Sequence, residues 1–170
     1  MRSLPVALAL SLAALSISTS LQGQRAATPI DPRSMQLLAQ GRAARAAGNL
    51  DAAVDAFETA VAVDPRNRAA FVALGDTAEA RGLPGKAIRY YREALTLEPN
   101  DVAALAGQGK ALVAKGAVNR ARDNLARVRA LCRGECGEAT QLAAVLAKGP
   151  PPDAPTATAQ TTVPPPPTRE

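Results

Sequence analysis

Apolar residues recur along the chain at the i, i+3, i+4 spacing that places them on one face of an α-helix. The clearest example lies between residues 51 and 63 and is formed by Ala53, Val54, Phe57, Ala60 and Val61. The pattern stops before Asp64-Pro65, because a proline disfavours helical geometry at the residue before it. Alanine dominates the composition and no run of β-branched residues alternates with polar ones, so the pattern predicts helices and no sheet.

The pattern returns with a period of 34 residues, in three copies. When the chain is shifted by this period, small and apolar residues coincide in four columns. The columns are Gly41, Gly75 and Gly109; Gly48, Gly82 and Gly116; Ala53, Ala87 and Ala121; and Phe57, Tyr91 and Leu125. A period of this length is typical of stacked helical hairpins, none of which can bury its apolar face alone.

Capping and breaking residues locate the expected helices. Asp31-Pro32 offers an N-cap and a first-turn proline, and a glycine interrupts each hairpin. The expected helices cover 32–47, 51–63, 67–81, 84–97, 101–115 and 118–131, in three repeats over 34–67, 68–101 and 102–135. Arg133 stands where the closing proline of the third repeat would be. Apolar residues recur once more at helical spacing over residues 136–148. Because the terminal repeats of a solenoid are atypical, 136–148 is predicted to be a capping helix.

This spacing resembles the tetratricopeptide repeat, which has Leu-Gly in its first helix, alanine and an aromatic residue in its second, and a closing proline. The second repeat matches at Phe71, Leu74, Gly75, Gly82, Ala87, Tyr91, Ala94 and Pro99. The first matches at Leu37, Gly41, Gly48, Ala53, Phe57, Ala60 and Pro65, and the third, more weakly, at Leu105, Gly109, Gly116, Ala121 and Leu125. The resemblance implies an all-α, right-handed solenoid of helical hairpins; it is specific for fold and not for function.

The resemblance also implies where a partner binds, because the first helices of tetratricopeptide hairpins line a concave groove. The implied positions are Met35, Leu38, Arg42, Arg45, Ala69, Val72, Asp76, Glu79, Ala103, Ala106, Lys110 and Val113. They mix apolar with charged residues, which suits an extended or helical peptide. The family's clamp for C-terminal carboxylates has asparagine where this chain has Arg42, Asp76 and Lys110, so that clamp is not expected.

Both ends of the chain carry appendages to the repeats. A basic start and an apolar run over 4–17 predict a signal peptide over 1–23, cleaved near 20–23, and a short linker over 24–33. Retention as a membrane anchor is the alternative, although a spanning helix needs about 20 apolar residues. The Pro/Thr-rich segment 149–170 is predicted to be disordered, with docking to a groove or glycosylation as alternatives. We therefore expect a small exported bacterial protein, periplasmic or secreted.

Cys132 and Cys136 are the only cysteines, and Gly134 between them indicates a turn. In an exported chain the pair predicts a disulfide that staples the capping helix. Redox activity is a weaker interpretation, since redox pairs usually have two intervening residues beside a sheet. Zinc would need two more ligands and the chain has no histidine, so no metal and no cofactor is expected.

Charge is distributed unevenly along the repeats. Residues 34–101 hold 8 Lys and Arg against 9 Asp and Glu, whereas residues 102–148 hold 8 against 3. Four arginines lie on the last repeat's second helix, on the expected convex side: Arg120, Arg122, Arg127 and Arg129. They form either a solvated face or a weak contact with an acidic protein or anionic lipid. Nucleic acid is not expected, because no aromatic residues accompany the arginines.

Taken together, these patterns predict an interaction adaptor or scaffold of the bacterial cell envelope that binds a peptide or partner protein in the concave groove. The alternative is a self-associating structural protein whose terminal repeats stack on another copy, forming a homo-oligomer. An enzyme is not expected, because carboxylates such as Asp51, Asp55 and Glu58 follow a solvated helix face and no nucleophile–base pair is evident.

Overall fold

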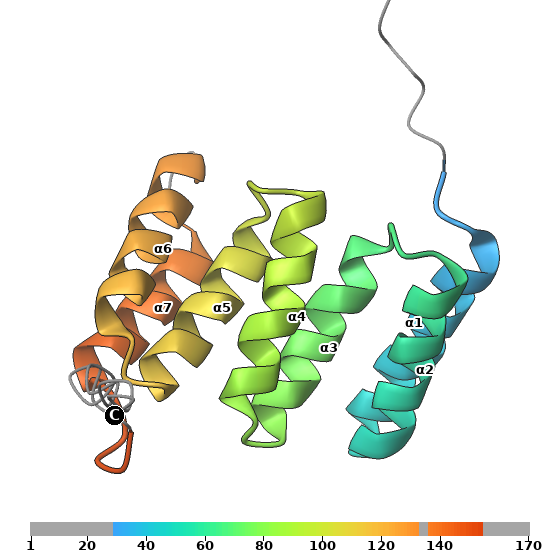
Figure 1. The fold of residues 1–170 in the computed structure, drawn as a ribbon, viewed down its shortest axis with the longest axis horizontal. Helices are drawn as coiled ribbons and strands as arrows, with labels where there is room; N and C mark the ends of the chain where they lie inside the picture. The colour runs from blue at the N-terminus through green and yellow to red at the C-terminus, as the bar shows by residue number, and fades with distance from the viewer. Residues whose placement is uncertain (1–28, 133–135, 155–170) are drawn as a thin grey trace, which may run out of the picture.

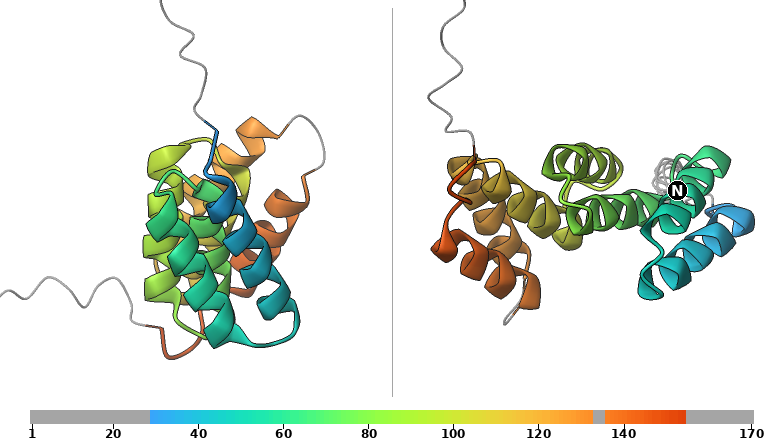
Figure 2. Two further views of the ribbon diagram at one scale, coloured as in Figure 1. Left: turned by 90° about the vertical axis from the view of Figure 1, so that its right-hand side faces the viewer. Right: turned by 90° about the horizontal axis from the view of Figure 1, so that it is seen from below.

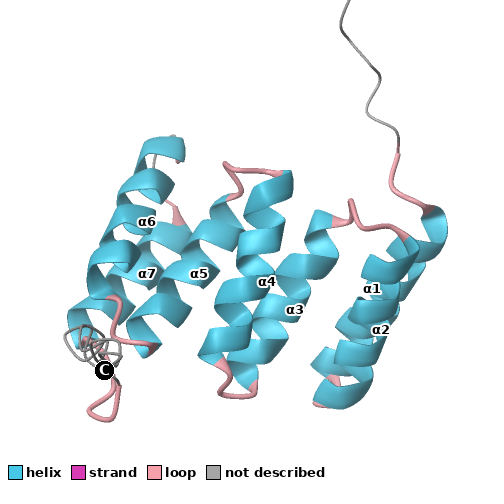
Figure 3. Ribbon diagram, viewed as in Figure 1, coloured by secondary structure: helices cyan, strands magenta, loops and turns pink. Residues whose placement is uncertain are grey.

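A computed structural model describes residues 29–132 and 136–154. These residues form seven α-helices and no strand (Figures 1 and 3). The helices are α1 (Pro32–Ala46), α2 (Leu50–Val63), α3 (Arg68–Ala80), α4 (Pro84–Leu97), α5 (Val102–Ala114), α6 (Val118–Leu131) and α7 (Gly137–Lys148). None of them is long and apolar enough to cross a membrane. The predicted signal peptide, residues 24–28 of the linker, residues 133–135 with the turn expected at Gly134, and residues 155–170 of the predicted tail lie outside the described residues.

The ends of the helices follow from local side-chain chemistry. Asp31, Asn49, Asn67 and Asp101 each accept a hydrogen bond from a free backbone N–H of the helix that follows, as N-cap residues do. After α1, α3 and α5, glycines with φ of 80°, 69° and 73° turn the chain into the second helix. Only glycine adopts this left-handed conformation at low cost, which explains why the column 48, 82, 116 contains no other residue. Each predicted helix end agrees with the structure to within one residue.

The hairpins α1–α2, α3–α4 and α5–α6 stack side by side into a curved array (Figures 1 and 2). Along the array, α1 contacts α3, α3 contacts α5 and α5 contacts α7. In contrast, the backbones of α2 and α4 do not come close to each other, nor do those of α4 and α6, and α2 and α4 meet only through long side chains such as Tyr90, which donates to Glu58 at 3.1 Å. The odd-numbered helices therefore lie on the inner, concave side, and the even-numbered helices are splayed apart on the convex side.

Close packing within the first two hairpins depends on a glycine of the first helix facing a large ring of the second. A Cβ atom added at Gly41 would lie 2.4 Å from the Phe57 ring, and one at Gly75 would lie 2.6 Å from the Tyr91 ring. Both rings are fully buried. Since these distances are shorter than any real Cβ contact, the aromatic residue fits only because the facing residue has no side chain.

The third hairpin replaces this contact with one from the capping helix. The equivalent of Phe57 and Tyr91 in the 34-residue register is Leu125, but the atoms nearest to a Cβ at Gly109 belong to Leu142 of α7, at 2.6 Å. Leu142 is fully buried. Thus α7 contributes the residue that completes the core of the third hairpin, and Leu125 does not fill that place.

Successive repeats are also linked by polar contacts that recur with the period. The amide of Asn67 donates to the Ser34 hydroxyl at 2.8 Å, and that hydroxyl donates to the Ala60 carbonyl at 2.7 Å. One repeat later, Asp101 forms an ion pair with Arg68. In both cases the N-cap residue of one repeat reaches back to the first helix of the preceding repeat, and this contact sets the spacing between hairpins.

Candidate functional site

The concave face brings together the groove positions predicted on α1, α3 and α5, with three exceptions. Nine of them are at least partly exposed: Met35, Arg42, Arg45, Ala69, Val72, Asp76, Glu79, Ala103 and Lys110. Leu38 is wrong as a groove residue, because it is 1% exposed and packs in the first hairpin's core with Phe57. Ala106 and Val113 are also wrong, because α7 packs against this part of α5 and leaves them 5% and 1% exposed.

Two ion pairs cross the concave face from one repeat to the next. Arg45 on α1 contacts Asp76 on α3 at 3.0 Å, and Glu79 on α3 contacts Lys110 on α5 at 3.6 Å. Both pairs join residues 31 apart, so the same contact occurs twice with the charges reversed. All four side chains retain between 22% and 39% exposure, and they remain accessible to a ligand.

The hydroxyl of Tyr91 lies between the two carboxylates. Its oxygen is 2.8 Å from Asp76 Oδ1 and 2.8 Å from Glu79 Oε2. A phenol has one proton to donate, so it satisfies one carboxylate at a time. Burial raises the pKa of Glu79, and burial together with the two nearby carboxylates strongly raises the pKa of Tyr91.

We name Arg45, Asp76, Glu79, Tyr91 and Lys110 the concave polar cluster. The cluster presents charges of alternating sign in fixed positions on the concave face. Among the described residues, no group of three metal-binding side chains is close enough to hold an ion.

Apolar side chains flank the concave polar cluster toward the N-terminal ends of the helices. Met35 is 45% exposed, and Ala69 and Val72 are partly exposed on the next first helix. Methionine is flexible and polarizable, which allows it to adapt to differently shaped apolar groups. The concave face therefore offers a shallow apolar strip beside a row of charges.

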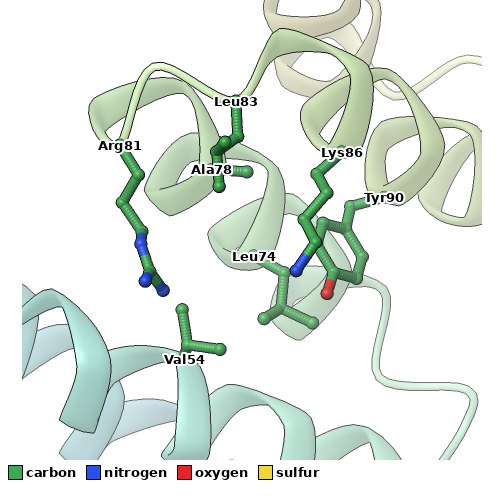
Figure 4. A pocket seen from close by; sticks show the side chains of 7 residues that line it. All are labelled: Val54, Leu74, Ala78, Arg81, Leu83, Lys86 and Tyr90. Carbon is green, nitrogen blue, oxygen red and sulfur yellow. The ribbon is translucent and has the colours of Figure 1, made fainter.

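A small hollow lies elsewhere, where α2 meets α3 and α4 (Figure 4). Its walls are Val54, Leu74, Ala78, Arg81, Leu83, Lys86 and Tyr90, and its volume is about 20 Å³. This volume holds about one water molecule. The hollow is a packing defect at the junction of two hairpins and is too small to bind a ligand.

The four arginines of α6 are exposed on the side of the array where they were expected. Two of them make contacts within the protein: Arg127 donates to the Pro99 carbonyl at 2.6 Å, and Arg122 donates to Asn119 at 2.9 Å. These contacts orient the guanidinium groups without burying them.

Cys132 and Cys136 lie at the junction between α6 and α7. Their Cα atoms are 5.9 Å apart, within the range that a disulfide spans. Both side chains are partly buried against the cluster of Leu105, Ala106 and Val128. The pair is placed where it can hold α7 against α5 and α6.

The contribution of Tyr91 to the concave face is not evident from its place in the repeat. Its column marks it as a core residue, and its ring is indeed buried. The sequence indicates the charges themselves, because the column Arg42, Asp76 and Lys110 alternates in sign and so places opposite charges on neighbouring first helices. Only the three-dimensional packing shows that the hydroxyl of a second-helix residue reaches through to these charges.

Comparison with known proteins identifies both the repeat and the fold. The sequence profile of the tetratricopeptide repeat matches residues 38–102 and 72–135. No curated protein matches the chain. Among solved structures, the first repeat domain of Spaghetti (RPAP3), bound to the HSP90 peptide SRMEEVD, is similar with a TM-score of 0.64 at 20% identity, covering 68% of this chain and 91% of that one.

Two further structures extend this comparison. The Yersinia enterocolitica type III secretion chaperone SycD, in complex with a peptide of the translocator YopD, has a TM-score of 0.62 at 19% identity, covering 67% of this chain and 89% of that one. A Thermobaculum terrenum O-GlcNAc transferase has a TM-score of 0.63 at 25% identity, covering 70% of this chain but only 23% of that one. The predicted all-α hairpin solenoid is confirmed by these similarities.

Proposed function

This chain belongs to the tetratricopeptide repeat family, and from that membership we propose that it is an adaptor that binds a peptide segment of a partner protein on its concave face. Proteins with this fold bind peptides, as the RPAP3 and SycD complexes illustrate. In this chain the proposal is carried by one observation, the row of charges and apolar groups that remains open on α1, on α3 and on α5 as far as Lys110.

The open face limits the size of the ligand. Since α7 covers Ala106 and Val113, the accessible strip runs from Met35 to Lys110 and does not extend to the end of α5. First helices packed at about 8–10 Å from their neighbours place α1 and α5 about 16–20 Å apart, which a short extended peptide or about three turns of helix spans. Its apolar side chains contact Met35 and Val72, and its polar groups meet the concave polar cluster.

We propose no catalytic activity for this chain. The transferase among its structural neighbours shares only 23% of its length with this chain, so the repeat region alone accounts for that likeness.

We further propose that the protein acts outside the cytoplasm, in the bacterial envelope. The apolar N-terminal run and the cysteine pair support this location, because a disulfide between Cys132 and Cys136 persists only in an oxidising compartment.

Stacking of terminal repeats is less favoured as a function. The apolar face that the third hairpin would expose is covered by α7, whose outward residues include Glu138, Gln141 and Lys148. An end of this kind resembles the polar terminal repeat that keeps solenoids soluble.

Peptide binding is tested by selecting ligands from a random peptide display library and measuring the affinity of an enriched peptide by calorimetry. We expect Met35→Ala and Arg42→Glu each to weaken binding at least about tenfold, equivalent to about 1.4 kcal/mol. Both residues are exposed, so neither substitution disturbs the core.

The matched control is Arg92→Glu, which makes the same charge change at an exposed position of α4 on the convex side. It is expected to leave the affinity unchanged. If the peptide loses affinity for the Arg92 variant and keeps it for the Arg42 variant, the binding surface is not the concave face and the proposal is wrong.

A further inference from the structure

The exposed face of α2 carries only acidic charge. Asp51, Asp55 and Glu58 are exposed and follow one another at i, i+4, i+7 spacing, and α2 contains no lysine or arginine. We call these three residues the acidic ridge; its length is about 10 Å, or two helical turns. Two neighbours contact it: Arg81 pairs with Asp51 at 2.9 Å, and the Tyr90 hydroxyl of α4 donates to Glu58 at 3.1 Å. Asp51 nevertheless remains 83% exposed.

The exposed face of α6 has the opposite charge. Arg120 and Arg127 form one row and Arg122 and Arg129 form another, and each row spans seven residues, again about 10 Å. Between the rows lie the exposed residues Asn119, Asp123, Ala126 and Ala130. We call this surface the basic face. Asp123 offsets one of its four positive charges, so the helix keeps a net charge of +3 against −3 for α2.

The two surfaces match in length and charge, but they cannot meet within one molecule. The hairpin α3–α4 separates α2 from α6, and the two helices make no contact (Figure 1). Asn119, Ala126 and Ala130 between the arginine rows are small enough to leave room for a ridge from another helix, whose carboxylates would then lie between guanidinium groups on both sides. Asp123 lies in the same strip and opposes the ridge, so the four arginines provide the attraction.

We propose that copies of this chain associate head to tail, with the acidic ridge of one copy seated on the basic face of the next. The contact is heterologous, because it joins two different surfaces, and a pair of copies keeps one free ridge and one free basic face, so further copies can add at either end. It uses the convex side, so it is independent of peptide binding on the concave face.

The strength of the contact follows from its exposure. Exposed ion pairs are individually weak and are screened by salt. Association is therefore expected at high protein concentration and low ionic strength, and is expected to weaken as salt is added.

The experiment is sedimentation velocity on the purified full-length protein at concentrations up to about 1 mM, the range of weak association constants. At about 20 mM salt we expect species larger than a monomer, growing with concentration. At about 500 mM salt, where the Debye length falls from about 20 Å to about 4 Å, the association constant is expected to fall at least about tenfold.

Charge reversal identifies the surfaces. Asp55→Lys with Glu58→Lys makes both surfaces basic, and Arg122→Glu with Arg129→Glu makes both acidic, so each variant alone is expected to stay monomeric. A mixture of the two restores opposite charges at every contact and is expected to assemble as the wild type does. Recovery on mixing requires both variants to be folded, so it separates lost contact from lost structure.

The matched control carries Arg89→Glu and Arg92→Glu on α4, an equal charge change outside both surfaces, and is expected to associate normally. A wild-type protein that is monomeric at low salt would overturn the proposal. So would charge-reversed variants that self-associate as the wild type does, or a mixture of them that stays monomeric.

Discussion

At the scale of single residues, Tyr91 serves the core and the concave face at once. Its ring packs against two first helices, since a Cβ at Gly75 or at Gly107 would lie 2.6 Å or 2.4 Å from it. Its hydroxyl contacts Asp76 and Glu79 on the open side. A buried ring thus fixes the positions of exposed charges, and the binding surface inherits the rigidity of the core.

The glycine that faces this ring supplies the first prediction. Gly75→Leu is expected to lower the free energy of unfolding by about 3 kcal/mol, because the added side chain overlaps the Tyr91 ring. Urea unfolding followed by circular dichroism measures the change. Gly85→Ala is the control: nothing lies within 4 Å of a Cβ there, so the substitution is expected to be neutral or slightly stabilising. Equal stability of the Gly75 variant and the wild type would contradict the packing described.

Asp64 supplies a second prediction, on pH. Hydrogen bonds from Arg66 and from the Asp31 N–H lower its pKa from 3.8 to about 2. A carboxylate whose folded pKa is lowered stabilises the protein above its ordinary pKa, and that contribution is lost as pH falls through the folded value. Between pH of about 4 and about 2, the wild type is expected to lose stability more steeply than Asp64→Asn.

Urea unfolding at a series of pH values compares the two proteins, which are expected to differ most near neutral pH and to converge near pH of about 2. Asp55→Asn removes one negative charge at an exposed position and is the matched control. Parallel curves for the wild type and the Asp64 variant would show that the contacts with Arg66 and Asp31 do not stabilise the fold.

At the scale of secondary structure, α7 decides how the array ends. It supplies Leu142 to the core of the third hairpin and buries Ala106 and Val113 on α5. The third repeat lacks an aromatic residue at its expected place, and the capping helix compensates for that absence from outside the repeat.

The prediction at this scale is that Leu142→Ala lowers the free energy of unfolding by about 3 kcal/mol, because it opens a cavity above Gly109. It is also expected to increase hydrogen exchange of α7 before that of α1 and α2, which α7 does not contact. Gln141→Ala, one residue away and exposed, is expected to change neither quantity. Uniform exchange along the whole array would show that α7 is not a separate capping unit.

At the scale of the whole molecule, the two ion pairs of the concave face join neighbouring repeats. In each pair, a carboxylate of the second repeat neutralises a cation of an adjacent repeat. Arg45 is paired with Asp76 and Lys110 with Glu79, so the cations nearest the centre of the face are already engaged by the chain's own carboxylates. A ligand that presents only negative charge gains little there.

The peptide SRMEEVD, which the RPAP3 domain binds, is therefore expected to show no measurable affinity for this protein at concentrations up to about 1 mM. Fluorescence anisotropy of a labelled peptide measures this, with the scrambled peptide as the control. Binding that exceeds the scrambled control and is lost in Arg42→Glu would show that the concave face does accept an acidic C-terminus.

The amino-acid sequence by itself determined the local structure. Periodicity, N-caps, turn glycines and prolines act on residues a few positions apart. The helices, their ends and their grouping into hairpins could therefore be predicted from the sequence. The tertiary structure alone decided which side chains remain accessible, because burial depends on elements distant in the chain. Leu38, Ala106 and Val113 lost their place on the surface, Leu142 replaced Leu125 above Gly109, and Tyr91 reached the concave face, each through a contact between helices that no local pattern encodes.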